Sequence, residues 1–102
     1  MTEKLDDILH ISLNVADITK SVAWYTSSFN CQVISASITR ASLQFGNIRL
    51  DLCLPSQDPC HIGLPKFDAE TYGPLSERHN GEQSTYISDP TGNLVELIKT
   101  EL

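Results

Sequence analysis

The sequence predicts an α+β fold made of two paired β-α-β-β-β modules, and two observations support this prediction. The stretch HISLNVAD at residues 10–17 returns as HIGLPKFD at residues 61–68, half of the 102-residue chain later. Each stretch is followed by segments with the apolar spacing of further helices and strands. Two such modules can bury together a sheet face that neither could bury alone. We therefore expect one domain over residues 1–102, with repeats at about residues 7–55 and 59–100.

The first module begins with a strand and a helix. Residues 9–15 alternate apolar and polar side chains, which is the period of a half-buried strand. Asp17 is a suitable N-cap for a helix. Apolar side chains then recur at helical spacing from Ile18 to Phe29, so we expect an amphipathic helix of about three turns.

Three more strands complete the first module. Alternating apolar residues predict them at residues 32–38, 40–45 and 48–54. Gly46-Asn47, between the last two, is a strong hairpin turn signal. On the last strand Arg49, Asp51 and Cys53 alternate with apolar residues, so these three side chains should share one face.

The second module repeats this order with weaker signals. We expect a short strand at residues 60–64 and a helix over residues 69–79 capped by Asp68, although Gly73-Pro74 would break or kink that helix. Strands are predicted at residues 84–88 and 94–99, with a dense turn signal at residues 89–93 between them. Little room is left before residue 84, so one strand of this module should be short or missing.

The composition argues against some classes of partner and indicates a cellular compartment. A net charge of -6 argues against a nucleic-acid or anionic-membrane surface. Cys31, Cys53 and Cys60 are an odd number without a C-x-x-C pair, so no disulfide framework or zinc ribbon is indicated. The N-terminal residues do not resemble a signal peptide, and no apolar run approaches the length of a membrane span. We therefore expect a cytoplasmic protein with neither nucleic-acid nor membrane partners.

Two histidines and two carboxylates occupy matching places in the two modules. His10 and His61 open the modules, and Asp51 and Glu96 lie on their closing strands. Because a buried carboxylate is costly without a partner, these four predict a site for a divalent metal ion such as Zn, Ni, Mn or Fe(II). Asp51 follows its Gly-Asn turn by one residue more than Glu96 does. Since a shift of one residue reverses a strand's faces, either the two turns differ or one carboxylate points away.

These motifs together resemble a known superfamily. HISLNVAD, a helix carrying Trp24-Tyr25, HIGL and YISDPTGNLVELI are similar to the corresponding segments of vicinal oxygen chelate proteins. That superfamily includes glyoxalase I, extradiol dioxygenases, fosfomycin-resistance proteins and bleomycin-binding proteins. The resemblance covers nearly the whole chain, and DPTGNLVEL is its most specific part. It implies a glyoxalase-like fold with a curved eight-stranded mixed sheet, and it implies a homodimer.

The resemblance also implies roles for individual residues. It assigns metal ligands to His10, His61 and Glu96, and Asp51 stands at the place of the fourth ligand of glyoxalase I. Tyr86 is similar to a tyrosine of the fosfomycin-resistance branch. Glu96 and Tyr86 are therefore the candidate catalytic residues.

The implied function is a metal-dependent reaction of a small substrate that carries two adjacent oxygens. A glyoxalase-like lyase or isomerase is slightly preferred, because the ligand count can reach four. Three alternatives remain open at this stage: an Fe(II) extradiol-type dioxygenase, a fosfomycin-resistance-like transferase, and a non-catalytic drug- or ligand-binding protein of the bleomycin-resistance type. Since Arg40, Arg49, Lys66 and Arg78 are scattered in the sequence, no basic cluster favours the transferase.

Overall fold

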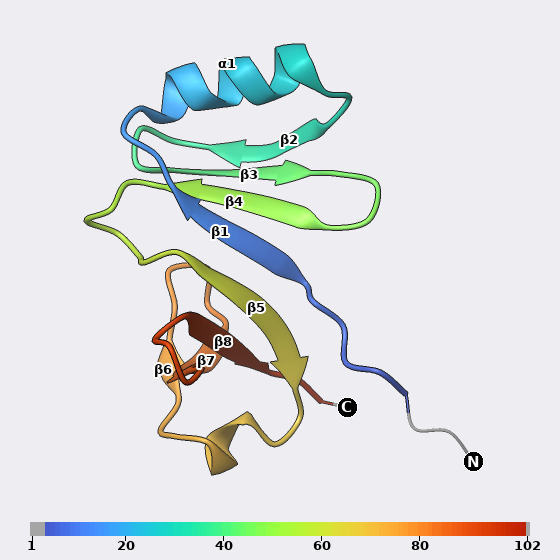
Figure 1. Cartoon of the computed structure of the whole chain (residues 1–102), viewed down its shortest axis with the longest axis vertical. Helices are drawn as coiled ribbons and strands as arrows, with labels where there is room; N and C mark the ends of the chain where they lie inside the picture. Colours follow the sequence, from blue (N-terminus) through green and yellow to red (C-terminus); the bar gives the residue numbers. More distant parts are fainter. Residues whose placement is uncertain (1–3, 102) are drawn as a thin grey trace. The chain divides into compact units, whose positions relative to one another are not determined.

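The structure is a computed structural model that describes residues 4–101. Its strands form an eight-stranded sheet in the order β2-β3-β4-β1-β5-β8-β7-β6. The sheet contains parallel and antiparallel pairs, so the predicted α+β fold with a mixed sheet is confirmed (Figure 1). Residues 1–3 and 102, which belong to the expected single domain and include the start of the N-terminal segment, lie outside the described residues.

Contacts divide the chain into two units, which we describe separately. The helical unit is His10–His61, and the terminal unit combines the residues up to Leu9 with those from Ile62 onward. Within the helical unit the strands follow the order β2-β3-β4-β1, and within the terminal unit they follow the matching order β6-β7-β8-β5. The shared order is what two related modules should show. The exact repeat boundaries remain a prediction.

The helical unit contains all the elements expected of the first module. They are β1 (His10–Asn14), α1 (Ile18–Ser28), β2 (Gln32–Ala36), β3 (Arg40–Gln44) and β4 (Arg49–Cys53). Strand β4 pairs with β1 in parallel and with β3 antiparallel. The turn at Gly46-Asn47 closes the β3–β4 hairpin, where the N–H of Phe45 donates to the carbonyl of Ile48 at 2.9 Å.

One face of this sheet forms the core of the helical unit. Ala41, Leu43 and Leu52 are buried on it together with Ile18 from the first turn of α1. Since side chains alternate along a strand, the neighbouring residues project from the other face. That second face carries polar side chains of β1, β3 and β4, among them Ser42 and Asp51, which hydrogen-bond across neighbouring strands at 2.8 Å. The predicted separation of Asp51 from the apolar side chains is therefore confirmed.

Helix α1 starts where the sequence predicts. The side chain of Asp17 accepts a hydrogen bond from the N–H of Lys20 at 3.0 Å, and this bond satisfies one of the amides that have no partner in the first turn. The helix ends at Ser28, and the N–H of Phe29 still donates to the carbonyl of Tyr25. Asp17 therefore fixes the position at which the chain leaves the sheet.

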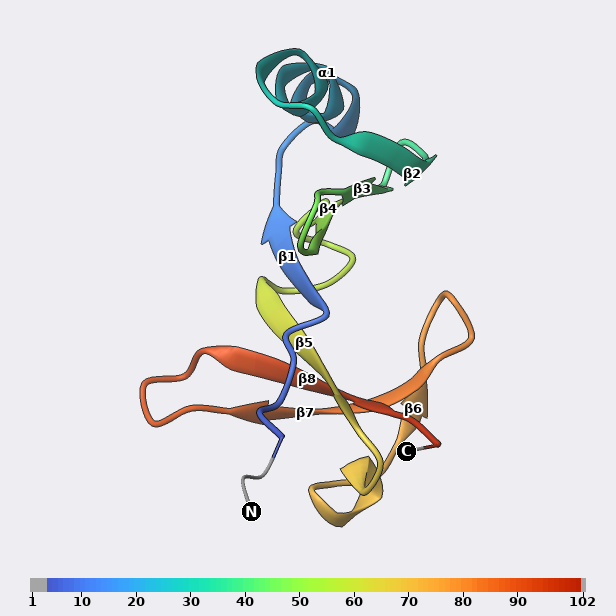
Figure 2. The same cartoon turned by 90° about the vertical axis from the view of Figure 1, so that its right-hand side faces the viewer.

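The terminal unit has shorter elements than the helical unit. They are β5 (His61–Lys66, whose first residue belongs to the helical unit), the 3-10 helix η1 (Ala69–Thr71), β6 (Ser76–Glu77), β7 (Gln83–Ser88) and β8 (Leu94–Lys99). Figure 2 shows β7 and β8 side by side, and they pair antiparallel. The two-residue β6 is the short strand that the sequence led us to expect.

The helix predicted over residues 69–79 is wrong. A single 3-10 turn forms, and the side chain of Asp68 makes no capping hydrogen bond to it. Gly73-Pro74 explains the difference, because proline cannot donate to an interior helical hydrogen bond and clashes with the preceding turn. Gly73 also lies against β7, where an added Cβ would come within 2.7 Å of Thr85 Oγ1. The backbone at Gly73 therefore packs directly against β7, and this close packing excludes a second full helix.

The turn between β7 and β8 has the chemistry expected of Asp-Pro-x-Gly. Gly92 has a φ of +93°, a left-handed conformation that glycine adopts without steric cost. Asp89 accepts hydrogen bonds from the backbone N–H groups of Thr91 and Asn93. This turn sets the register that places Glu96 opposite Tyr86. No helix in the described part of the chain is long and apolar enough to cross a membrane.

Candidate metal centre

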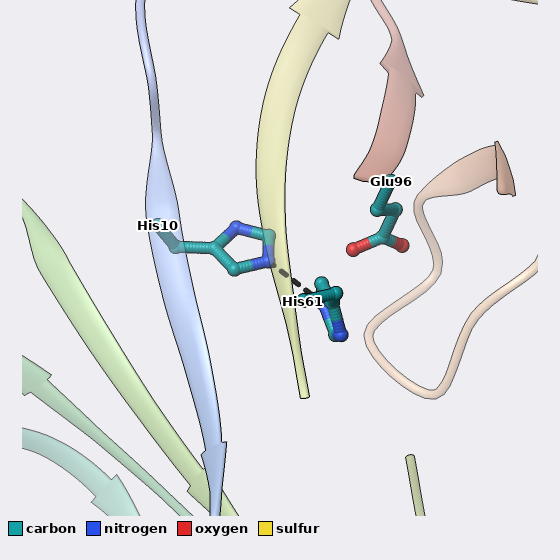
Figure 3. A group of neighbouring side chains, drawn as sticks. All are labelled: His10, His61 and Glu96. Carbon is teal, nitrogen blue, oxygen red and sulfur yellow. Dashed lines mark hydrogen bonds between the residues drawn. The ribbon is translucent and has the colours of Figure 1, made fainter. Parts of the chain in front are cut away.

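Two buried histidines face each other in the helical unit. His10 is the first residue of β1 and His61 is the first residue of β5. Their Nε2 atoms lie 3.2 Å apart, and the rings meet edge to face (Figure 3). At 3% and 9% exposure both rings are largely removed from solvent. The two halves of the sequence motif therefore bring two imidazole nitrogens to one point.

The second ring nitrogen of each histidine contacts a different kind of group. Nδ1 of His61 lies 2.8 Å from the carbonyl oxygen of Pro59, which can only accept a hydrogen bond. Nδ1 of His10 lies 3.0 Å from Nη2 of Arg49, which can only donate one. His61 is thus oriented as metal-binding histidines usually are, with Nδ1–H on a carbonyl and the lone pair of the ring on Nε2. His10 has the opposite arrangement.

Asp51 is engaged within the helical unit. Its carboxylate accepts hydrogen bonds from Nε and Nη2 of Arg49, at 2.9 and 3.0 Å, and from Ser42 at 2.8 Å. Parallel pairing places Asp51 beside Ser12 and places Arg49 beside His10. The salt bridge to a neighbour, one of the interpretations open for Asp51, is therefore present. Its role as a fourth metal ligand stays a prediction.

Glu96 lies on β8 in the terminal unit and is 7% exposed. Ser84 donates a hydrogen bond from Oγ to its Oε2 at 2.6 Å, and Arg78 lies 3.6 Å from the same oxygen. These two partners explain how a carboxylate tolerates burial, because each stabilises its charged form. Ser84 also orients the carboxylate, since it fixes one of the two oxygens.

Tyr86 is the cross-strand neighbour of Glu96, so the two candidate catalytic residues share a face of the β7–β8 pair. The guanidinium of Arg78 stacks over the Tyr86 ring at 4.8 Å from the ring centre. One arginine thus contacts both candidate residues. Its cation attracts the Glu96 carboxylate and the π face of Tyr86 together.

The donor chemistry of these residues suits a divalent ion. Among the described residues, the group that could hold a metal ion consists of His10, His61 and Glu96, each buried and each offering one ligand atom. Two imidazoles and one carboxylate suit Zn, Ni, Mn or Fe(II). The contact of the Arg49 guanidinium with Nδ1 of His10 opposes such a use, because it favours the proton on Nε2.

The two arginines were not recognised as site residues from the sequence. Arg49 could have been found, because the alternation of RLDLC puts it on the same face as Asp51. What the alternation does not give is the parallel register that aligns Arg49 with His10. Arg78 carried no usable signal, since it falls in the segment for which a helix was predicted.

Comparisons with known proteins identify the fold. A scan against protein-family models and a search of curated proteins returned no match. Solved structures do match. A hypothetical protein from Bacillus halodurans C-125 has a TM-score of 0.76 at 14% identity, with 97% of each chain covered.

Two further matches carry informative descriptions. A glyoxalase/bleomycin resistance protein/dioxygenase superfamily member from Vibrio splendidus 12B01 has a TM-score of 0.72 at 13% identity, over 94% of this chain and 100% of that one. A variant of Streptomyces coelicolor methylmalonyl-CoA epimerase, in complex with 2-nitronate-propionyl-CoA, also has a TM-score of 0.72, at 17% identity, over 97% and 100% of the two chains. The chain therefore has the glyoxalase-like fold of these structures, as its motifs led us to expect.

Proposed function

We propose that this protein is a metal-dependent enzyme in which His10, His61 and Glu96 bind one divalent ion. The substrate is a small molecule with two adjacent oxygens. The observation that carries the proposal is the pair of buried imidazoles whose Nε2 atoms approach to 3.2 Å. Two imidazole nitrogens this close together are ligand atoms that a divalent ion prefers, and a buried carboxylate supplies the negative charge that a cation needs.

Within this proposal each chain residue has a chemical role. A bound divalent ion supplies Lewis-acid chemistry that polarises a substrate oxygen. Glu96 accepts a proton from a carbon next to that oxygen and returns it to a neighbouring carbon. Ser84 holds the Glu96 carboxylate in one orientation. Tyr86, beside Glu96 on the next strand, contacts the substrate.

The reaction class we favour is a glyoxalase-like lyase or isomerase reaction. An epimerase is among the proteins of similar fold, so the fold is compatible with isomerisation. Arg49 and Arg78 are each paired with an acidic side chain, which leaves neither as an uncommitted cation for a phosphonate. This pairing makes a fosfomycin-resistance-like transferase the weaker choice. An Fe(II) extradiol-type dioxygenase and a non-catalytic ligand-binding protein remain as outcomes of the test.

Metal titration of the stripped protein tests the proposal. Calorimetry with Zn(II), Ni(II), Mn(II) and anaerobic Fe(II) should show one ion per chain. We expect H10A, H61A and E96Q each to weaken binding by about 100-fold or more, since changing even the outer partners of metal ligands costs about 10–100-fold. His79, the third histidine, is exposed and outside the group, so H79A should bind as the wild type does.

The possible results separate the alternatives. Tightest binding of Ni(II) or Zn(II) supports isomerisation, whereas retention of Fe(II) supports dioxygenase chemistry. Wild-type protein that takes up none of the four ions, or E96Q and H10A that bind as wild type does, would overturn the metal-dependent enzyme. A ligand-binding protein would then be the better description.

We also propose that the protein is a cytoplasmic homodimer. The described cysteines are all free, which favours a reducing compartment. Strand β2 is exposed along its whole length, including Val33 and Ile34, and Trp24 and Phe29 of the same unit are exposed as well. Exposed apolar strands of this kind are typical of surfaces that associate. Light scattering after size exclusion should give twice the chain mass, and I34K should give the mass of one chain.

A further inference from the structure

Five residues of the helical unit form one continuous chain of hydrogen bonds. Asp51 binds the guanidinium of Arg49 through two oxygens. Arg49 Nη2 contacts His10 Nδ1 at 3.0 Å, His10 Nε2 contacts His61 Nε2 at 3.2 Å, and His61 Nδ1 contacts the carbonyl of Pro59 at 2.8 Å. Every member of the chain lies within His10–His61.

The two ends of this chain determine where its protons lie. Arginine has only donors, so Nδ1 of His10 must be an acceptor and the ring proton is on Nε2. A backbone carbonyl has only lone pairs, so Nδ1 of His61 carries a proton and Nε2 of His61 is the acceptor. The central contact is then His10 Nε2–H donating to His61 Nε2. Both assignments agree at that contact.

This arrangement places a proton on the atom of His10 that a metal ion would need. Binding at Nε2 requires a lone pair there, and the ring proton must then move to Nδ1. In that tautomer Nδ1–H and the Nη2–H of Arg49 would be two donors pointing at each other. Arg49 thus stabilises the form of His10 that cannot bind metal through Nε2.

We propose that Arg49 is a positioning residue that sets the His10 tautomer and thereby lowers the affinity of the proposed metal site. This inference rests on the proposed function of that site. Asp51 holds Arg49 in place, and Ser42 in turn holds Asp51. The metal therefore binds only when Arg49 moves away from Nδ1. An acceptor must then replace Arg49 at Nδ1, and the Asp51 carboxylate, which Arg49 now binds, is an acceptor in the same chain of contacts.

Three variants separate this role from a structural one. R49Q replaces a donor-only group by an amide whose oxygen can accept Nδ1–H. R49K shortens the side chain but keeps a donor-only group. R40Q is the matched control, because Arg40 also pairs with an aspartate, Asp58, at similar exposure in the same unit, yet neither residue belongs to the hydrogen-bonded chain described above.

Nitrogen NMR of the metal-free protein provides the first readout. Two-bond ¹⁵N–¹H spectra distinguish the two neutral tautomers of each histidine. We expect Nε2–H at His10 and Nδ1–H at His61 in the wild type, R49K and R40Q, and a shift toward Nδ1–H at His10 in R49Q. A wild-type His10 that carries its proton on Nδ1 would overturn the inference without any metal being involved.

Metal affinity provides the second readout. We expect R49Q to bind Zn(II) and Ni(II) about 10–100-fold more tightly than the wild type, while R49K and R40Q stay within a few-fold of it. Equal affinity of R49Q and wild type would overturn the effect of Arg49 on the site. If the tautomers shift as expected but no variant binds any ion, the proposed metal site fails and the control of His10 by Arg49 is still supported.

Discussion

Ser84 donates a 2.6 Å hydrogen bond from its Oγ to Oε2 of Glu96, two strand positions away across the β7–β8 pair. Ser84 is fully buried, and its hydroxyl oxygen also accepts from Nε of Arg78. The small side chain therefore links a partly buried cation to a buried anion. Hydrogen bonds to charged groups are among the strongest in proteins.

Replacing Ser84 by alanine should destabilise the protein by about 2 kcal/mol, because the buried Glu96 carboxylate loses a donor and Arg78 loses an acceptor. Urea unfolding followed by circular dichroism measures this loss. Ser88 lies on the same strand and face but is exposed, so S88A should stay within about 0.5 kcal/mol of wild type. Equal effects of the two variants would show that the Ser84–Glu96 bond contributes little.

Gly73 and Thr85 make a second close approach. An alanine Cβ at position 73 would lie 2.7 Å from Thr85 Oγ1, so we expect G73A to cost about 1–3 kcal/mol in overpacking. T85A removes that oxygen, and G73A should therefore cost at least about 1 kcal/mol less in the T85A background. Unfolding of the single and double variants gives the coupling. A Cβ at Gly46 meets nothing within 4 Å, so G46A is the control, and additive effects at positions 73 and 85 would contradict the steric account.

The strands could be predicted because their signals are local. In β1 and β4 apolar and polar residues alternate, and this alternation shows directly which side chains reach the core. Leu43 and Leu52 are completely buried as that pattern requires. The hairpin at Gly46-Asn47 is equally local, since two residues set the turn.

The features that could not be predicted depend on distant parts of the chain. Arg49 and His10 are 39 residues apart, and only the parallel pairing of β4 with β1 brings them together. The segment around Gly73 depends on how closely the chain passes Thr85, which no local pattern contains. Residue types alone thus identified the histidines and Glu96 as candidates, but not the arginines that hold two of them.

The two aspartates that end the repeated motif should differ in their effect on stability. Asp17 caps α1 through its side chain, so D17A should cost about 1 kcal/mol. Asp68 caps nothing, and its Oδ1 is buried with no hydrogen-bond partner. D68A should therefore leave the free energy of unfolding unchanged or slightly higher. Chemical denaturation compares the two variants directly, and a loss for D68A as large as that for D17A would contradict this assignment.

Asp89 should make stability depend on pH in the acid range. The side-chain amide of Asn93, the N–H groups of Asn93 and Thr91, and the Thr91 hydroxyl all donate to its carboxylate, and they lower its pKa from 3.8 to about 2 despite a small opposing desolvation effect. A carboxyl with a lowered pKa binds fewer protons in the folded than in the unfolded state. Its contribution is therefore complete well above pH 3.8 and is lost as the pH falls through about 2.

Carboxyl NMR titration should give Asp89 a midpoint near 2 in the wild type. The midpoint should be higher in N93A, because this variant lacks the Asn93 side-chain amide, the donor that lowers the pKa of Asp89 most. Unfolding measured at several pH values provides the thermodynamic check. The difference in stability between wild type and D89N should shrink as the pH falls from about 4 to about 2, since the wild-type carboxylate becomes protonated only in that range. A wild-type midpoint that N93A does not raise would mean that Asn93 does not hold the charge, and the turn would then owe its order to Gly92 and Pro90.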